Sequence, residues 1–195
     1  MASNPAADPP RQGHIPGEGG VWMLIAGDGI LFSLLFGLFL FYRADNPAMF
    51  AESQALLSTE LGLLNTVLLL TSSWLVASAI RAARAGKPGV MRGCLTWAIA
   101  CSLGFMAVKA VEYTPKIASG ITLSSNDFFM LYYVYTAIHL IHVVIGTGVL
   151  LTMRAYAGEA PYSANALRNF ESGASFWHLV DLLWIVLFAL LFLIN

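Results

Sequence analysis

The sequence has 195 residues, of which 58% are hydrophobic and only 11% are charged, and its formal net charge is −1. A water-soluble domain carries roughly a quarter charged residues, so this composition excludes an ordinary soluble enzyme. Nucleic-acid binding requires a strong basic patch, and a chain with this charge balance offers none, so we expect no nucleic-acid partner. The mean hydropathy of +0.72 instead indicates an integral membrane protein.

The first 20 residues differ from the rest of the chain. They contain Pro5, Pro9, Pro10 and Pro16 and no apolar periodicity, so we expect residues 1–20 to form a flexible tail. They also lack a short apolar core followed by a cleavage site, so we expect no removable signal peptide.

Five apolar runs follow, each close to the ~20 residues that a helix needs to cross a bilayer. We expect membrane helices at about 21–42, 61–83, 93–113, 128–153 and 174–194. The connections between them carry Pro, Gly and charged residues, which are typical of turns. Residues 21–195 are therefore predicted to form one all-α domain, an integral membrane bundle of five transmembrane helices.

The Lys and Arg residues of the tail and the short connections predict the orientation of this bundle, because cytoplasmic loops carry an excess of both. One side would hold seven such residues and the other only two: Arg11, Arg81, Arg84, Lys87, Arg92, Arg154 and Arg168 against Arg43 and Lys116. We therefore expect a multi-pass protein of the cell (inner) membrane, with the N-terminus in the cytoplasm and the C-terminus outside.

Acidic residues and histidines occur inside three of the predicted helices. They are Asp28, His139, His142, His178 and Asp181. An ionisable side chain inside a bilayer is costly unless it faces protein and finds a partner. Because all five lie in the predicted cytoplasmic half of the bilayer, we expect them to form one internal polar cluster. His178 and Asp181 are three residues apart and share a helix face, so we expect them to be direct partners.

Three further charged residues have simpler expected roles. Lys109 and Glu112 are also three residues apart on one helix, so we expect them to pair with each other near the outer end of the bundle. Glu171 precedes the last apolar run, where a carboxylate suits the start of a helix. We expect Glu171 to act as a cap and an interface residue.

Two of these positions also suggest more specific chemistry. His139 and His142 face the same way, as two metal ligands would, but only His178 could join them at depth, so packed and hydrogen-bonded histidines are favoured. Asp28 is either a proton-relay carboxylate or a hydrogen-bonded anchor between helices. The sequence contains no nucleophile triad or phosphate-binding loop. We therefore expect no catalytic, cofactor-binding or metal-binding residues in this chain.

Short motifs in all five predicted helices resemble one known family. They are Trp22 with Gly27-Asp28; Asn65-Thr66 through Leu68 to Ser73; Lys109 with Glu112-Tyr113; His139-x-x-His142-Val143 with Gly146; and Glu171 with Trp177-His178-x-x-Asp181-x-x-Trp184. Together they resemble the cytochrome c oxidase subunit III family in a short, five-helix form. The family pattern usually has Ser-Glu where this chain has Gly27-Asp28, so the carboxylate is one methylene shorter here.

A second set of motifs resembles the branch of this family that is associated with nitric oxide reductase. It consists of Pro16-Gly17-Glu18-x-Gly20-x-Trp22 and Lys109-x-x-Glu112-Tyr113. The family resemblance implies an accessory subunit without a redox metal of its own. Its partner would be the catalytic haem–copper subunit of a respiratory complex, which would hold haem and copper or iron. The resemblance also implies support of that subunit's stability and proton uptake, in aerobic electron transport or in nitric oxide reduction, with bound phospholipid.

Two other functions stay open at the level of the residues. A free-standing small transporter or proton-conducting bundle could line a path with the same acidic and histidine side chains, although transporters often contain repeats and broken helices. An assembly factor for nitric oxide reductase would bind the complex and then leave it.

Overall fold

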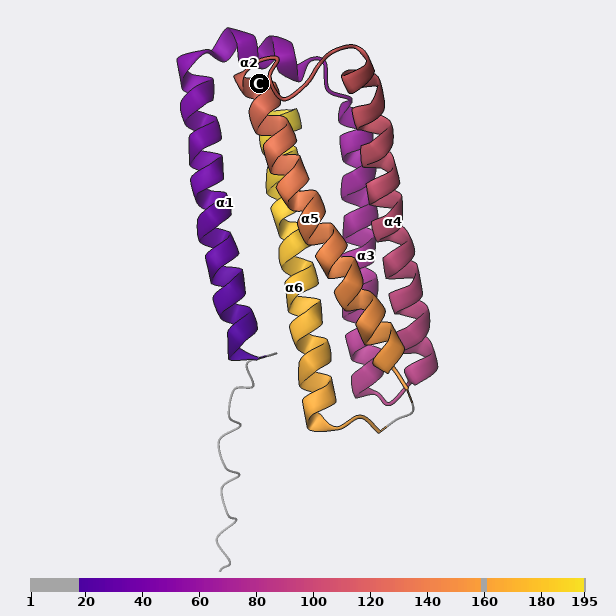
Figure 1. Ribbon diagram of the computed structural model, residues 1–195. Coiled ribbons are helices and arrows are strands. Elements are labelled where there is room, and N and C mark those ends of the chain that lie inside the picture. Colours follow the sequence, from indigo (N-terminus) through magenta and orange to yellow (C-terminus); the bar gives the residue numbers. More distant parts are fainter. Residues whose placement is uncertain (1–17, 159–160, 195) are drawn as a thin grey trace, which may run out of the picture.

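The structure is a computed structural model that describes residues 18–158 and 161–194, and these are almost entirely helical (Figure 1). The elements are α1 (Gly19–Asp45), α2 (Pro47–Gln54), α3 (Thr59–Arg84), α4 (Pro88–Ala118), α5 (Asp127–Tyr156), α6 (Ala164–Phe188) and the π-helical turn η1 (Ala189–Leu193). Five helices are long and apolar enough to cross a membrane. This confirms the predicted all-α bundle of five membrane helices. Residues 1–17 of the predicted tail lie outside the described residues.

The long helices run up and down in alternation, so each is antiparallel to the next long helix along the chain (Figure 1). Helices α3, α4, α5 and α6 pack into one group, with α3 along α4 and with α6 against both α3 and α5. Helix α1 stands to one side and meets the group through α5 and α6. The short helix α2 lies across one end and connects α1 to α3.

The helices extend beyond the apolar runs, because capping side chains and proline determine where each helix begins. The Ser163 hydroxyl accepts a hydrogen bond from the Ala166 amide at 3.2 Å, so α6 begins at Ala164 rather than near residue 174. The short α2, which hydropathy did not indicate, begins with Asn46 as its cap and Pro47 in its first turn. The helices are therefore longer than the membrane-spanning stretches that they contain.

A tight turn joins α3 to α4 and makes them antiparallel neighbours. Gly86 has a φ of 65°, in the left-handed region that favours glycine at a helix end. The amides of Gly86 and Lys87 donate to the carbonyls of Ala83 and Ala82 at 3.0 and 2.9 Å. Pro88 then occupies the first turn of α4, where its missing N–H is not needed.

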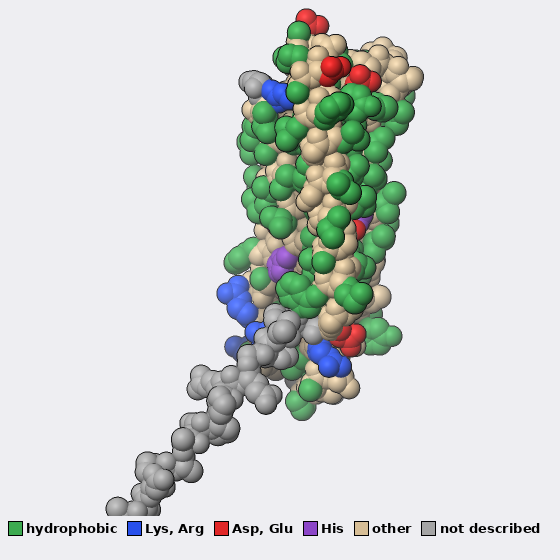
Figure 2. Space-filling model, turned by 90° about the vertical axis from the view of Figure 1, so that its left-hand side faces the viewer, with side chains coloured by type: hydrophobic (Ala, Val, Ile, Leu, Met, Phe, Trp, Pro, Cys, Tyr) green, Lys and Arg blue, Asp and Glu red, His purple; other side chains and the backbone are tan. Residues whose placement is uncertain are grey.

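The surface agrees with a bilayer environment. Figure 2 shows a face covered over most of its height by apolar side chains, with Lys, Arg, Asp and Glu gathered mainly toward the two ends. Helix α1 is the most exposed of the five spanning helices, since only 11% of its most apolar window is buried inside the chain. An exposed apolar helix of this kind is suited to lipid or to a neighbouring subunit.

Small polar side chains connect the helices through the interior. The Ser72 hydroxyl of α3 donates to the Ala98 carbonyl of α4 at 3.0 Å, and the Thr147 hydroxyl of α5 donates to Ser102 of α4 at 3.0 Å. All of these side chains are small, so they let the helices approach closely while pairing their polar groups, as in other membrane bundles.

One of the closest helix contacts is at Gly146 on α5. A Cβ added there would lie 2.7 and 2.9 Å from two ring carbons of Trp177 on α6, and Trp177 is 1% exposed. Real Cβ atoms do not approach other atoms so closely, so only glycine fits at this contact.

We therefore expect Gly146→Ala to lower the free energy of unfolding by about 1–3 kcal/mol, because the buried indole must shift. Gly148→Ala is the matched control, since a Cβ at Gly148 meets nothing within 4 Å. That change should be neutral or stabilise the helix by up to about 1 kcal/mol. Thermal unfolding of both variants in detergent micelles measures the difference, and equal melting temperatures would contradict this account of the α5–α6 contact.

Candidate functional site

The interior ionisable residues form separate groups rather than one cluster. Asp28 meets His142 between α1 and α5, and His178 meets Ser73 between α6 and α3. Within residues 18–158 and 161–194, no hydrogen bond or ion pair joins one group to the other. His139 lies apart from both, and its neighbours are aromatic rings. The expected single cluster of five is therefore divided, because the antiparallel helices bring these residues to different faces.

Asp28 and His142 hold α1 against α5. Asp28 Oδ2 lies 3.4 Å from His142 Nε2, and the two side chains are 18% and 15% exposed. His142 Nδ1 lies 2.8 Å from the Ile138 carbonyl of its own helix. A carbonyl oxygen only accepts, so Nδ1 carries a hydrogen and Nε2 is the nitrogen that faces the Asp28 carboxyl. The contact therefore connects α1 to α5.

Ser73 of α3 is the partner of His178. The Ser73 hydroxyl is 2.6 Å from His178 Nδ1, and this hydrogen bond joins α6 to α3. The three-residue spacing of His178 and Asp181 places both toward α3, but they are not direct partners. Asp181 Oδ1 has no hydrogen-bond partner among the residues that the structure describes.

His139 is packed among rings. The side chain has 0% exposure, and its ring centre is 5.7 Å from that of Phe105 and 5.3 Å from that of Trp184. Neither ring nitrogen has a hydrogen-bond partner among the residues that the structure describes. The expectation of a packed histidine agrees with this position, whereas the expected hydrogen bond is not found there. Over the same residues, no three His, Cys, Asp or Glu side chains converge as metal ligands would.

The most strongly buried charges are those of Lys109 and Glu112 on α4. Lys109 Nζ lies 2.8 Å from Glu112 Oε2, and the two side chains are 2% and 0% exposed. The Tyr132 hydroxyl of α5 donates to Glu112 Oε1 at 2.8 Å. Lys116 Nζ, one turn further along α4, is 3.6 Å from the same oxygen. Both carboxylate oxygens are thus occupied, as a buried carboxylate requires.

Aromatic rings surround the Lys109 ammonium group. Its Nζ lies 4.9 Å from the ring centre of Trp184, 5.3 Å from that of Tyr132, 5.5 Å from that of Tyr113 and 5.8 Å from that of Phe192. Ring faces attract a cation at these distances, most strongly where water is excluded. Tyr113 also hydrogen bonds to Thr136 of α5. The group therefore joins α4, α5, α6 and η1 near the end of the bundle that carries α2.

Two members of this buried group, Lys116 and Tyr132, were not identified from the sequence. Lys116 lies four residues after Glu112, which is a helical pairing distance, but it was assigned to a connection because Pro115 precedes it. Helix α4 in fact continues through Pro115 to Ala118. Tyr132 is on another helix, and nothing local in the sequence relates it to Glu112.

Glu171 lies inside α6 rather than at its start. Helix α6 begins at Ala164, so Glu171 is about two turns in, and it is 7% exposed. Arg84, near the end of α3, donates to Glu171 Oε1 from Nη2 at 2.7 Å and from Nε at 3.2 Å. A guanidinium that uses two nitrogens on one carboxylate makes a directional contact. Glu171 therefore links α6 to α3 at the end of the bundle opposite α2.

We expect Glu112→Gln to lower the free energy of unfolding by about 3–5 kcal/mol, because two buried ammonium groups lose their carboxylate. Lys109→Met should have a smaller effect, since Glu112 keeps Lys116 and Tyr132 as partners. The exposed Glu52 of α2 offers a control, Glu52→Gln, that should change stability little. Thermal unfolding in detergent tests this order, and a Glu112→Gln variant as stable as the control would exclude the proposed role of the carboxylate.

Ser73→Ala removes the hydroxyl that hydrogen bonds to His178, and we expect it to lower the free energy of unfolding by about 1–3 kcal/mol. The control is Ser33→Ala on α1, where the exposed hydroxyl donates to the Gly29 carbonyl of its own helix. Thermal unfolding of both variants is compared with that of the unchanged chain. If the two serine variants have the same melting temperature, Ser73 does not hold α3 against α6 in the way described.

Comparison with known proteins gives a consistent family. The sequence profile described as "Cytochrome c oxidase subunit III" matches residues 20–195. Cytochrome c oxidase subunit 3 of the platypus, Ornithorhynchus anatinus, is 33% identical over 129 residues, which cover 66% of this chain and 48% of that protein. The chain thus spans about half the length of this relative.

Two bacterial proteins match over more of their length. Quinol oxidase subunit 3 of Bacillus subtilis is 29% identical over 183 residues, covering 90% of this chain and 86% of that protein. Cytochrome c oxidase subunit 3 of Synechocystis is 29% identical over 177 residues, covering 90% of this chain and 74% of that protein. These matches favour a membrane subunit of a haem–copper oxidase over a transporter or an assembly factor, and they do not support the nitric oxide reductase branch in particular. With five spanning helices and a profile match over almost its whole length, the chain belongs to the cytochrome c oxidase subunit III family.

Proposed function

We propose that this chain is a non-catalytic membrane subunit of a haem–copper oxidase complex in aerobic electron transport. The observation that carries the proposal is the family match over residues 20–195, together with relatives that are named as third subunits of cytochrome c and quinol oxidases. The partner is the catalytic subunit, which would hold the haem and the copper. The names of the relatives favour an oxygen-reducing partner over a nitric oxide reductase.

The proposed role of the chain is to stabilise the catalytic subunit and to support its proton uptake. Asp28 and His142 favour the second part of this role, because they place a carboxyl 3.4 Å from an imidazole inside the bundle. Asp28 lies nine residues into α1, which is about 14 Å at 1.5 Å per residue. The pair thus lies within the half of the bundle nearer the start of α1, between the exposed helix α1 and the remainder of the bundle.

The proposed orientation places the start of α1 in the cytoplasm. Arg81, Arg84 and Lys87 near the end of α3, and Arg92 at the start of α4, lie at the same end of the bundle as the start of α1 (Figure 1). An excess of Lys and Arg favours the cytoplasmic side. In this orientation, the end that carries α2 and η1 faces outward.

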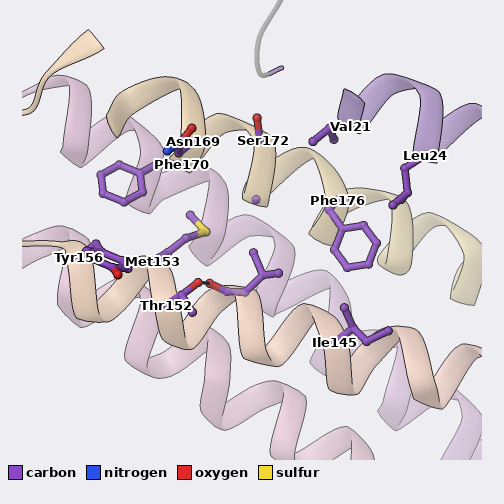
Figure 3. Close-up of a pocket in the computed structure, with 12 residues that line it drawn as sticks. Val21, Leu24, Ile145, Thr152, Met153, Tyr156, Asn169, Phe170, Ser172 and Phe176 are labelled. Carbon is purple, nitrogen blue, oxygen red and sulfur yellow. Dashed lines mark hydrogen bonds between the residues drawn. The ribbon is translucent and has the colours of Figure 1, made fainter. Parts of the chain in front are cut away.

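Bound phospholipid is part of the same proposal. A groove of about 420 Å³ lies between α1, α5 and α6, and its walls are mostly apolar. Figure 3 shows side chains of all three helices around it, among them Leu24 of α1, Ile145 of α5 and Phe176 of α6. An apolar groove open to the bilayer suits an acyl chain. Lipid here would fill the space that the loose packing of α1 leaves.

The test is recovery of the chain from its native membranes by an affinity tag on the full sequence, in a mild detergent. We expect a haem–copper subunit to be recovered with it in about equal amount, with the haem absorbance of an oxidase and with oxygen consumption. Recovery of the chain alone, or with a nitric oxide reductase, would contradict the proposal.

A second measurement addresses the transporter alternative. The purified chain alone, reconstituted in liposomes, should leave the proton permeability equal to that of protein-free liposomes. Flux above that background would favour a proton-conducting bundle. Transient association during assembly is distinguished in the first experiment, because an assembly factor would be absent from the mature, active complex.

A further inference from the structure

Two polar side chains in the core of the bundle have no partner within the described part of the chain. They are Asn65 of α3 and His139 of α5, and both are 0% exposed. The amide oxygen and the amide nitrogen of Asn65 both lack a hydrogen-bond partner, and so do both ring nitrogens of His139. Buried polar groups in proteins are paired in the great majority of cases, so these two residues point to a ligand.

The register of the helices places Asn65 and His139 in one layer of the core. The Ser72 hydroxyl bonds to the Ala98 carbonyl at 3.0 Å, which sets the height of α3 against α4. Two turns nearer the α2 end, Asn65 occupies the same face of α3 as Ser72. Because the helices are antiparallel, Phe105 is at this height on the same face of α4 as Ala98. The Phe105 ring centre lies 5.7 Å from that of His139.

A second set of contacts places the two residues beside Trp184 of α6. Its ring centre lies 5.3 Å from that of His139 and 4.8 Å from that of Phe105. Its N–H donates at 3.0 Å to Thr66, the residue next to Asn65. Trp184 and Phe105 are themselves 0% exposed. The layer is therefore closed by aromatic rings, and a ligand there must be small and fully enclosed.

The arrangement of the helices explains why Asn65 and His139 do not bond to each other directly. Helices α3 and α5 each pack against α4 and α6, so they face each other across the bundle rather than side by side. A bridging molecule replaces one hydrogen bond by two, each about 2.8–3.0 Å long. It therefore connects two side chains that cannot reach each other.

The unpaired atoms define the chemistry of the ligand. An amide offers N–H donors and an oxygen acceptor, and a neutral imidazole offers one donor and one acceptor. A ligand that satisfies both groups must itself donate and accept, whereas chloride only accepts and a metal ion binds only acceptors. The nearby Lys109 ammonium group already has Glu112 as its counter-charge at 2.8 Å, so it does not require an anion. The ligand is therefore a neutral donor and acceptor.

We propose that this layer is a binding site for a buried water molecule that bridges Asn65 and His139. Water combines two donors and two acceptors in the smallest volume, and a buried water in a protein makes about three hydrogen bonds to polar groups of this kind. The bridge connects α3 to α5 across the core and fixes the orientation of the His139 ring. It uses residues of this chain alone, so it does not depend on the proposed catalytic partner.

The experiment is nuclear magnetic resonance of the isotope-labelled full chain in detergent micelles. The probe is water itself, detected by cross-relaxation from its protons to side-chain N–H protons. We expect cross-peaks from water to the Asn65 amide protons and to the His139 ring N–H proton. Their sign should be that of a long-lived contact and not that of proton exchange with the solvent.

Asn65→Leu tests whether one water serves both residues, because leucine has a similar shape and no polar atom. We expect this variant to lose the water cross-peak at His139. The reciprocal variant, His139→Phe, should lose the cross-peak at the Asn65 amide, so the test holds if one variant fails to fold. Ser72→Ala is the matched control, since it removes a buried hydroxyl from the same face of α3. It should keep both cross-peaks.

Thermal unfolding supplies a second, independent measurement. Asn65→Leu and His139→Phe each leave one buried polar group without its shared partner, and each should lower the melting temperature by about 4–8 °C. The double variant removes both polar groups together. Because no buried donor or acceptor is then left unpaired, it should lower the melting temperature no more than one single variant does.

Three outcomes would overturn the proposal. The first is the absence of a water cross-peak at both Asn65 and His139 in the unchanged chain. The second is a cross-peak at His139 that persists in Asn65→Leu, which would show that the water is not shared. The third is a double variant in which the two losses of melting temperature simply add.

Discussion

The fold depends on a constraint that the bilayer imposes: a polar side chain without water must find its partner inside the protein. Glu112 meets this constraint most completely. Its carboxylate takes Lys109, Lys116 and the Tyr132 hydroxyl as partners, and aromatic rings from α4, α5, α6 and η1 enclose the neighbouring ammonium group. One end of the bundle is thereby fixed by a contact for which α4, α5, α6 and η1 must all be in place.

The other polar contacts follow the same constraint with weaker partners. Ser73 hydrogen bonds to His178 between α3 and α6, and Arg84 holds Glu171 between the same helices. Asp28 and His142 connect α1 to α5, and Tyr135 donates to the Leu35 carbonyl of α1 at 2.5 Å. Helix α1 otherwise presents an apolar surface outward, so its position depends on few polar contacts and on what covers it in the membrane.

These features agree with a supporting subunit. The charged and polar groups mostly hold one helix against another. The relatives of the chain are named as third subunits of oxidases. Two hollows in the described part of the chain differ in chemistry because they lie between different helices. The groove beside α1 is apolar, whereas the hollow between α3 and α6 has arginines at its mouth.

The sequence by itself determined the features that depend on one helix at a time. Hydropathy predicted five spanning helices, and the three-residue spacing of Lys109 and Glu112 placed both side chains on one face of α4. The motifs also indicated the family that the profile match later showed. Each of these follows from residues that are close along the chain.

Only the tertiary structure decided which helix faces meet. Ser73 bonds to His178, Tyr132 bonds to Glu112, and His139 packs against Trp184 instead of joining His142 and Asp28 in a polar cluster. The rotation and tilt of each helix select these neighbours, and close contacts such as Gly146 with Trp177 fix them. A periodicity shows which residues share a face, but the partner of that face can be far away along the chain, 105 residues for Ser73 and His178, and is set by packing.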